Sequence, residues 1–439
     1  MKKIILAIIG IVLLVVVGVG MRYLLAYNGF LDKITARKPE MKVYDVIVME
    51  ESDLWQTEDL KEKSVGFLKI DSKAANAEQK LREMIEGGSS EIDFVIDADF
   101  YDDVDTMTKA LKNKITDAMV LETDRLEMLK EENMATGFRV AFSFEVELGS
   151  EDMEISDKQI TKEPFILYIS GSDSRTGVKT TARSDVNILA VINPKQGKIL
   201  LVSIPRDTYV QLHDTVGLRD KLTHAGVYGI NMNKTTIEDF LGINIDYTLK
   251  VSFDTVIKVV DQLDGIDIES DTEMTLKLES GGACGYTIGK QHVDGICALR
   301  FARERKSYET GDKHRGENQQ QVIKSIINRL VSSKDYLLKI PTILDIAADS
   351  FETTISRENI SGFVRMQLID GVKWNIESIA IDGDGTYEPT YSMGENLPLY
   401  VMIPYEDSAL SVKNKIIEYL EDALVEDDAT EKSNVENVE

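Results

Sequence analysis

Two apolar runs around a short turn constrain the fold of this chain most strongly. The segments 186–192 and 199–204 are largely aliphatic, and they flank the sequence Asn-Pro-Lys-Gln-Gly at 193–197. Asparagine, proline and glycine favour turn geometry, and apolar runs bounded by turn residues are typical of buried strands. The pattern therefore predicts a β-hairpin whose strands are buried on at least one face.

Four charged residues lie at the open end of this predicted hairpin. A turn centred near residues 195–196 places Asp185 opposite Arg206 on the neighbouring strand, and Arg183 and Asp207 then lie beside them. So many charges at the end of two apolar strands indicate a functional site. A cross-strand ion pair between Asp185 and Arg206 is the structural alternative.

Length, charge and cysteine spacing limit the class of protein. A chain of 439 residues is too long for one ordinary core and suggests two domains. Its formal charge of −26 and the absence of a basic stripe argue against nucleic-acid binding. The four histidines lack HExxH spacing and the two cysteines lack CxxC spacing, so neither a zinc site nor a redox dithiol is expected.

The N-terminus carries a predicted membrane anchor. Lys2 and Lys3 precede residues 4–21, eighteen uncharged residues that are long enough to span a bilayer. The positive-inside rule keeps the two lysines in the cytoplasm and places the remainder outside. A cleaved signal peptide is the alternative, but no A-x-A-like site follows the apolar run. We therefore expect a single-pass protein of the cell membrane with extracellular C-terminal domains.

Patterns along the chain predict two folded domains. Residues 41–150 alternate between apolar runs, such as 92–96, and helical segments, which predicts a small α/β domain. The acidic run 97–105 is interpreted as a solvated surface, with a cation site as the alternative. A charged stretch without apolar periodicity separates this domain from a larger one. The predicted parts are a cytoplasmic stub (1–3), the anchor (4–21), a connector (22–40), an accessory domain (41–150), a linker (151–163), the larger domain (164–425) and a disordered acidic tail (426–439).

Two aspartates near the hairpin are candidate metal ligands. Asp173 follows the predicted strand 165–169, and Asp185 begins the hairpin. If the two strands are neighbours, both carboxylates lie at one edge of the sheet, where they could hold Mg²⁺ together with substrate phosphates. Asp173 could instead be a turn residue. The sequence after it does not fit a Walker A motif, because Gly177 and Lys179 are wrongly spaced.

A second charged cluster follows about one hundred residues later. Arg303 and Arg305 can face one ligand only if the helix before them ends there, because residues two apart do not share a helix face. Arg315 and Gln319 are four apart and share one face at the start of the next helix, predicted over 317–331. A helix N-terminus also attracts anions. The cluster favours a pyrophosphate ligand, and a surface network of salt bridges is the alternative.

Cys284 and Cys297 flank a turn-rich segment before Arg303. Two cysteines in an exported domain favour a disulfide, which would brace this segment. Two free, buried thiols are the alternative.

Seven motifs, in this order, resemble the LytR-CpsA-Psr family of Gram-positive bacteria. They are GSDSR, RSD, SIPRDTYV, KLTHAGVYG, VDQLDGIDIE, ALRFARER and GDKHRGENQQ, and the resemblance covers residues 164–331. The anchor and the additional domain are similar to the capsule-associated branch of that family. We expect an α/β (α+β) fold whose larger domain has a mixed central sheet with helices on both faces.

The resemblance also implies an activity. Family members are phosphotransferases that move anionic or capsular glycopolymers, such as teichoic acids, from a polyprenyl-pyrophosphate carrier to peptidoglycan. It implies that Asp173 and Asp185 hold Mg²⁺, with Mn²⁺ as a substitute. Asn318 and Asp264 depart from the usual motifs, and the first of them removes one phosphate contact. The residues implied to contact the pyrophosphate are Arg183, Arg206, Arg303, Arg305, Arg315 and Gln319.

The expected mechanism rests on charge neutralisation, because phosphoryl transfer needs positioning more than a special nucleophile. Asp185 and Arg206 would hold the reacting group, and either Asp207 or Asp312 would accept the proton of a peptidoglycan hydroxyl. Apolar faces at 256–263, 322–330 and 337–346 could line a tunnel for the polyprenyl chain. Two alternatives remain open: a polyprenyl-pyrophosphate pyrophosphatase, and a non-catalytic scaffold or regulator of envelope polymer assembly.

Overall fold

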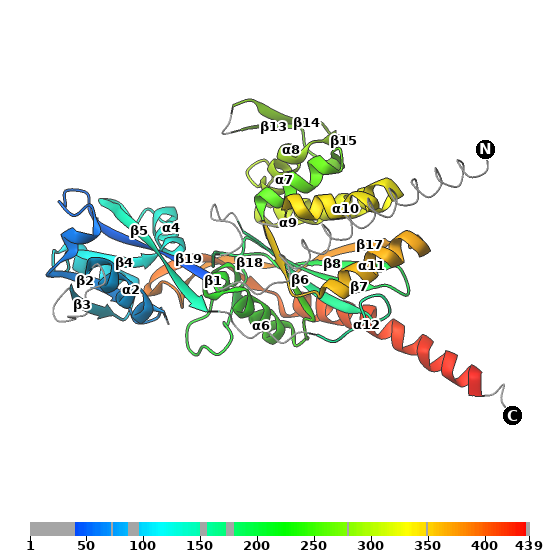
Figure 1. The fold of residues 1–439 in the computed structure, drawn as a ribbon, viewed down its shortest axis with the longest axis horizontal. Coiled ribbons are helices and arrows are strands. Elements are labelled where there is room, and N and C mark those ends of the chain that lie inside the picture. The colour runs from blue at the N-terminus through cyan, green and yellow to red at the C-terminus, as the bar shows by residue number, and fades with distance from the viewer. Residues whose placement is uncertain are drawn as a thin grey trace, which may run out of the picture.

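The computed structural model describes residues 40–71, 73–86, 96–149, 156–172, 180–278, 281–347 and 350–435. Figure 1 shows an N-terminal unit at the left, a central sheet with its helices, and a smaller group of helices and hairpins above that sheet. We call residues 40–149 the N-terminal unit. The predicted anchor lies outside the described residues, and no helix within them is both long and apolar enough to cross a bilayer.

The N-terminal unit is a five-stranded mixed sheet with helices. Its strand order is β3-β2-β4-β1-β5. Alternate residues of β1 point to opposite faces, so Val46 and Val48 enter one apolar cluster and Ile47 enters another. The elements are β1 (Glu40–Met49), η1 (Thr57–Leu60), β2 (Lys63–Leu68), α2 (Ala74–Glu86), β3 (Ile96–Tyr101), α3 (Val104–Lys112), β4 (Ala118–Glu122), α4 (Thr123–Glu131) and β5 (Phe138–Gly149).

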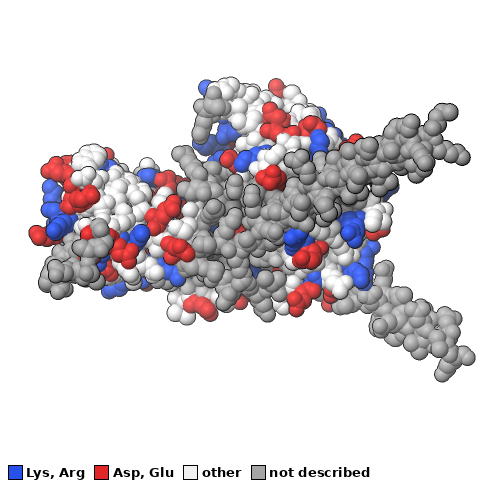
Figure 2. Space-filling model, viewed as in Figure 1, with Lys and Arg blue, Asp and Glu red and all other residues white. Residues whose placement is uncertain are grey.

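Most of the predicted strand at 92–96 lies outside the described residues. Strand β3 begins at Ile96 and takes in the start of the acidic run, while residues 87–95 lie outside the described chain. The remaining acidic residues have local partners: the side chain of Asp103 accepts the amide of Thr106 at the start of α3, and Asp105 pairs with Lys109 at 2.5 Å. Figure 2 shows acidic and basic side chains interspersed on the visible surface of this unit.

The central sheet contains the predicted hairpin and mixes parallel and antiparallel pairs. Its order is β16-β11-β6-β7-β8-β17, and β7 pairs antiparallel with β6 and β8. Ile188 lies opposite Ser203 and Asn193 opposite Lys198, which is the register that the predicted turn requires. The strands are β6 (Phe165–Ser172), β7 (Val186–Asn193), β8 (Lys198–Ser203), β11 (Tyr247–Ser252), β16 (Phe351–Thr353) and β17 (Asn375–Ala380).

Helices cover both faces of this sheet, as predicted. On one face, Leu189 and Val191 pack with residues of α6 (Ile230–Leu241) and α12 (Glu406–Val435). On the other face, Ile188 packs with residues of α9 (Asp312–Val331) and α11 (Arg357–Asp370). The alternation of buried side chains along β7 explains why its sequence is apolar almost throughout.

Two helix boundaries differ from the predicted ones. Helix α9 begins at Asp312 instead of residue 317, directly after Gly311, so Asp312 and Arg315 lie in its first turn. Helix α12 continues to Val435, although a disordered tail was expected from residue 426. The tail contains four Glu, which have high helix propensity, but its acidic composition without aromatic residues had suggested disorder.

A smaller cluster lies beside the central sheet and contains both cysteines. Its core joins α7 (Phe253–Gln262) and α8 (Gly295–Arg303) to two short antiparallel strand pairs. The outer pair is β12 (Ile266–Ser270) with β15 (Gly289–Val293), and the inner pair is β13 (Met274–Lys277) with β14 (Ala283–Tyr286). Cys284 and Cys297 form a disulfide between β14 and α8.

An antiparallel ribbon connects the sheet domain with the N-terminal unit. It consists of β18 (Gly383–Thr390) and β19 (Gly394–Pro404), of which the sequence indicated only residues 399–403. Met393 and Leu399 are buried in an apolar cluster with Leu126 and Met128 of α4. The N-terminal unit therefore shares a hydrophobic core with the rest of the molecule.

Candidate active site

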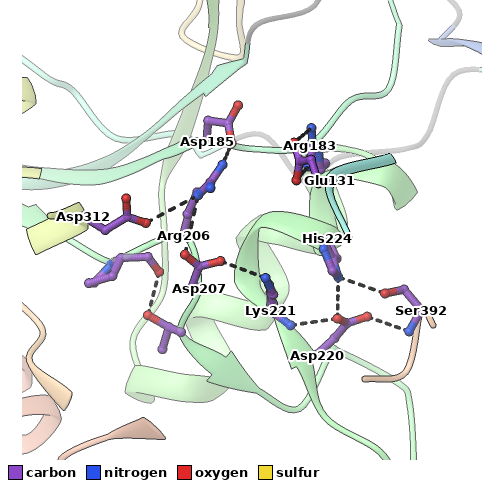
Figure 3. Close-up of polar contacts among 12 residues, drawn as sticks. Glu131, Arg183, Asp185, Arg206, Asp207, Asp220, Lys221, His224, Asp312 and Ser392 are labelled. Atoms are coloured by element: carbon purple, nitrogen blue, oxygen red, sulfur yellow. Dashed lines mark hydrogen bonds and ion pairs between the residues drawn. The ribbon is translucent and has the colours of Figure 1, made fainter. Parts of the chain in front are cut away.

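The open end of the hairpin forms the centre of a charged cluster. The guanidinium of Arg206 donates a hydrogen bond from Nη1 to Oδ1 of Asp185 at 2.9 Å, the cross-strand contact expected from the turn. Nε of Arg206 lies 3.6 Å from a carboxylate oxygen of Asp207 and 3.6 Å from one of Asp312 (Figure 3). Three carboxylates thus surround one guanidinium.

Residues of β10 (Asp220–Lys221) and α5 (Leu222–Ala225) complete one side of this cluster. Lys221 places Nζ 3.3 Å from Oδ1 of Asp207. Asp220 contacts His224 at 2.6 Å and accepts the amide of Lys221 at 2.8 Å, which fixes the backbone of this short segment. Sequence reasoning did not single out Lys221 as a site residue, although the KLTHAGVYG motif contains it.

The carboxylates of Asp207 and Asp312 form a coupled pair. Burial raises the pKa of Asp207, and its hydrogen bond to Asp312 adds to the increase, against the opposing effect of Lys221 and Arg206. Burial also acts to raise the pKa of Asp312, but Arg315, the hydrogen bond from Asp207 and Arg206 lower it on balance. The contact between the two carboxylates therefore favours the protonated form of Asp207 and the ionised form of Asp312.

Helix α9 delivers two further predicted residues. Arg315 donates from Nη2 to Oδ2 of Asp312 at 3.3 Å, and Gln319 follows one turn later on the same face. Gly316 allows this helix to approach β8, because a Cβ atom at that position would lie 2.8 Å from Oγ of Ser203. A small cleft of about 20 Å³ is lined by Asp185, Arg206, Asp312, Arg315 and Gln319.

Arg303 and Arg305 lie at the end of α8, as the sequence required. Helix α8 ends at Arg303, whose guanidinium carbon lies 4.7 Å from the ring centroid of Phe253. Arg305 is about half exposed, and its Nη1 lies 3.7 Å from Oδ1 of Asp312. Arg305 therefore joins the cluster through Asp312, whereas Arg303 lines the apolar cavity described next.

An apolar cavity of about 330 Å³ lies next to the charged cleft. Gln319 lines both spaces, and Arg303 lines the cavity. Of the three apolar faces predicted to form a tunnel, those of α7 and α9 contribute, whereas none of the described lining residues comes from 337–346. The apolar lining residues include Ile169, Val186, Leu249, Val256, Val259, Val322, Ile323 and Ile326.

Arg183 has a partner that the sequence did not reveal. Its Nη1 and Nη2 donate to the two carboxylate oxygens of Glu131, at 2.8 and 3.0 Å. Glu131 belongs to α4 of the N-terminal unit, so no local pattern around Arg183 could have indicated it. Asp173, the other candidate metal ligand, lies outside the described residues. Within them, no group of three or more His, Cys, Asp or Glu side chains is arranged to hold a metal ion.

Similarity to known proteins now identifies the family of the chain. The model of the LytR_cpsA_psr family matches residues 134–402, more than half of the chain. A polyisoprenyl-teichoic acid–peptidoglycan teichoic acid transferase, TagU of Halalkalibacterium halodurans, is 31% identical over 265 residues, which cover 59% of this chain and 80% of that protein. TagU of Bacillus subtilis is 31% identical over 236 residues, covering 52% and 73%.

The fold agrees with these sequence matches. The crystal structure of B. subtilis TagV superposes with a TM-score of 0.51 and 29% identity, and the match covers 59% of this chain and 98% of TagV. The resemblance drawn from the seven motifs is therefore confirmed. The chain belongs to the LytR_cpsA_psr family.

Proposed function

We propose that this protein transfers an anionic glycopolymer from a polyprenyl-pyrophosphate carrier to peptidoglycan at the outer face of the cell membrane. One observation carries the proposal: a cluster of arginines and carboxylates adjoins an apolar cavity, and Gln319 lines both. A polyprenyl pyrophosphate has the same two parts, a dianionic or trianionic head and a hydrocarbon chain. Such a donor would place its chain in the cavity and its diphosphate in the cleft.

The donor diphosphate would bind to groups that already form a positive frame. Arg206 and Arg315 line the cleft, and Arg303 lines the adjoining cavity. Nε of Arg206 is buried and donates no hydrogen bond to the described residues, so it can donate to an arriving phosphate oxygen. Arginine presents a planar set of donors that matches phosphate oxygens.

The reaction would proceed by attack of an acceptor hydroxyl on the phosphorus that carries the polymer. A new P–O bond forms to the peptidoglycan sugar, and the bond from that phosphorus to the bridging oxygen of the diphosphate breaks. Polyprenyl phosphate leaves with the bridging oxygen. The Asp207–Asp312 pair would accept the hydroxyl proton when both carboxylates are ionised, and the arginines would offset the charge on the leaving phosphate.

Mg²⁺ is the cofactor that we propose, with Mn²⁺ able to replace it. Carboxylate oxygens suit a hard cation, and Asp185 would hold it together with Asp173. The carboxylates of the cleft are already paired with Arg206 and Arg315, so a bound diphosphate brings negative charge that these residues do not fully offset. The ion would supply electrophilic stabilisation of the diphosphate oxygens. Chelation by EDTA should stop transfer, and added Mg²⁺ should restore it.

Teichoic acid is the proposed polymer class, because the relatives TagU and TagV carry that activity in their names. The additional N-terminal unit resembles the capsule-associated branch, so a capsular polymer is the second donor to compare. The predicted anchor at 4–21 would hold the protein beside its lipid substrate.

The test is a transfer assay with the full-length chain in detergent. Polyprenyl-pyrophosphate-linked teichoic acid and peptidoglycan fragments are supplied, and the products are analysed by mass spectrometry. A phosphodiester-linked polymer together with polyprenyl phosphate is the expected result. Polymer phosphate released to water would instead identify a pyrophosphatase, and no release of polyprenyl phosphate would identify a scaffold.

A further inference from the structure

The contact between Arg183 and Glu131 brings the N-terminal unit into the active site. Both oxygens of the Glu131 carboxylate accept from the guanidinium, in the paired geometry that a phosphate group would use. The side chain of Arg183 is only 16% exposed, whereas that of Glu131 is 53% exposed. A carboxylate on the solvent side therefore covers a largely buried arginine that lines a small cleft together with Arg206.

The position of Glu131 is fixed by the interface between the two parts of the molecule. Glu131 is the last residue of α4, whose Leu126, Met128 and Leu129 are buried in the core shared with the ribbon. The guanidinium of Arg125, also on α4, donates to the carbonyl oxygen of Ser392. Because α4 is packed on one side and tied to the ribbon by this bond, it cannot move without breaking buried contacts.

The surroundings of Glu131 are positively charged. Burial acts to raise the pKa of Glu131, but Arg183 lowers it on balance, and Arg206 and Lys221 contribute in the same direction. Glu131 is thus held ionised. It lines a small cleft together with Arg183, Arg206, Lys221 and the neighbouring Glu132. The carboxylate lies where these cations would attract an anionic substrate.

We infer that Glu131 is an internal anion that competes with the donor diphosphate for Arg183. The outer phosphate of the donor must displace Glu131 before it can pair with the Arg183 guanidinium. The side chain of Glu131 can rotate towards solvent while α4 stays in place, because more than half of it is exposed. The N-terminal unit thereby sets the affinity of the active site for its donor. This inference rests on the proposed function, because it takes the donor to be a diphosphate.

The test measures binding of methylene diphosphonate, a diphosphate analogue that cannot be hydrolysed, to the full-length protein by calorimetry. In Glu131→Gln the competing charge is lost while the side chain keeps its size and one acceptor oxygen. We expect this variant to bind the analogue about tenfold more tightly than the wild type, since like charges in one site oppose each other. Inorganic phosphate, which need not reach Arg183, should bind both proteins equally.

Two control variants separate competition from a general effect of charge. Glu132→Gln removes one negative charge from the same cleft, but no contact of Glu132 with Arg183 is among the hydrogen bonds and ion pairs of the described residues, so its effect should be much smaller. In an Arg183→Gln background, Glu131→Gln should have no effect on diphosphonate affinity. Melting temperatures of all variants verify that each is folded.

Three results would overturn the inference. Weaker binding by Glu131→Gln would mean that Glu131 positions Arg183 instead of competing for it. Equal affinity of the variant and the wild type, including no binding by either, would mean that Arg183 does not contact the diphosphate. A similar gain in diphosphonate affinity in Glu132→Gln would mean that the loss of any negative charge from the cleft has the same effect. A failure of the proposed function gives a different result. The protein would then bind diphosphonate tightly but transfer no polymer, and the competition between Glu131 and the diphosphate for Arg183 would still hold.

Discussion

The molecule contains two networks of paired charges that differ in burial and in the distance between the partners. The first lies in the N-terminal unit, where Lys42 contacts Asp71 at 3.2 Å and Glu122 at 2.7 Å, and Arg125 contacts Glu122 at 2.5 Å. Each of these four side chains is at most 5% exposed. Burial acts to raise the pKa of Glu122, but Arg125 and Lys42 lower it to about 2.

The second network surrounds Arg206 and is looser. Nε of Arg206 lies 3.6 Å from a carboxylate oxygen of Asp207 and 3.6 Å from one of Asp312, and it makes no hydrogen bond to the described residues. The side chains of Arg206, Asp185 and Asp312 are between 18% and 28% exposed. The comparison separates two roles of buried charge. We call the first network closed, because it is almost fully buried and connects structural elements. We call the second open, because it is partly exposed and keeps Nε of Arg206 available for a ligand.

The largest expected effect is on catalysis at the open network. Arg206→Ala should reduce polymer transfer by about 10²- to 10³-fold, because it removes the central cation that would face the diphosphate. The melting temperature should change little, since Asp185 and Asp312 are partly solvated and the buried Asp207 keeps its contact with Lys221. Transfer rates and thermal unfolding of the same preparation measure both effects. Arg82→Ala on α2, which removes a partly buried pair with Glu78 far from the cleft residues in the sequence, is the matched control and should leave transfer unchanged.

At the closed network we expect a loss of stability with little loss of transfer. Arg125→Met leaves Glu122 buried beside a single cation and removes the bond to the ribbon, so unfolding should become easier by about 3–5 kcal/mol. Urea unfolding followed by circular dichroism measures the change. Transfer per folded molecule should stay within a few-fold of the wild type. A loss of transfer without a loss of stability would erase the distinction between the two networks.

A smaller effect is expected in the apolar cavity. Ile326→Gln places a polar group among the lining residues, so the KM for a long-chain polyprenyl donor should rise about tenfold through lost apolar contact. A donor with a short prenyl chain, which does not reach Ile326, should be affected less. Leu338→Gln is the control, because Leu338 is exposed on α10 and does not line the cavity. Equal effects on both donors would place the chain elsewhere.

The smallest effect concerns Asp124, which lies between the two networks. Burial raises its pKa to about 6, although Arg183 opposes this increase. The folded state therefore binds more protons than the unfolded state between about pH 4 and pH 6, and stability falls as the pH rises through this window. In Asp124→Asn this fall should be absent, with a difference of a few degrees in melting temperature. Identical pH profiles for the two proteins would show that Asp124 does not titrate in this way.

The hairpin site was predictable because its signal is local. Side chains on a strand alternate with period two and a tight turn fixes the register, so the opposition of Asp185 and Arg206 follows from counting residues. Arg315 and Gln319 were predictable for a similar reason, since a spacing of four places side chains on one face of a helix.

The contacts across the interface were not predictable in this way. Glu131 and Arg183 are 52 residues apart, one at the end of helix α4 and the other in the segment before β7, and nothing in either neighbourhood specifies the pairing. The ribbon was also largely missed, because most of β18 and the first part of β19 are polar or rich in glycine and become strands only by pairing with each other. Contacts that depend on the docking of two units leave no periodic pattern in either segment.

The most direct test of the account is a crystal structure of the protein with a non-hydrolysable polyprenyl diphosphate analogue. The account predicts that the prenyl chain occupies the apolar cavity and that the diphosphate contacts Arg206 and Arg315, with Glu131 displaced from Arg183. A diphosphate bound away from Arg206, or a prenyl chain outside the cavity, would contradict it.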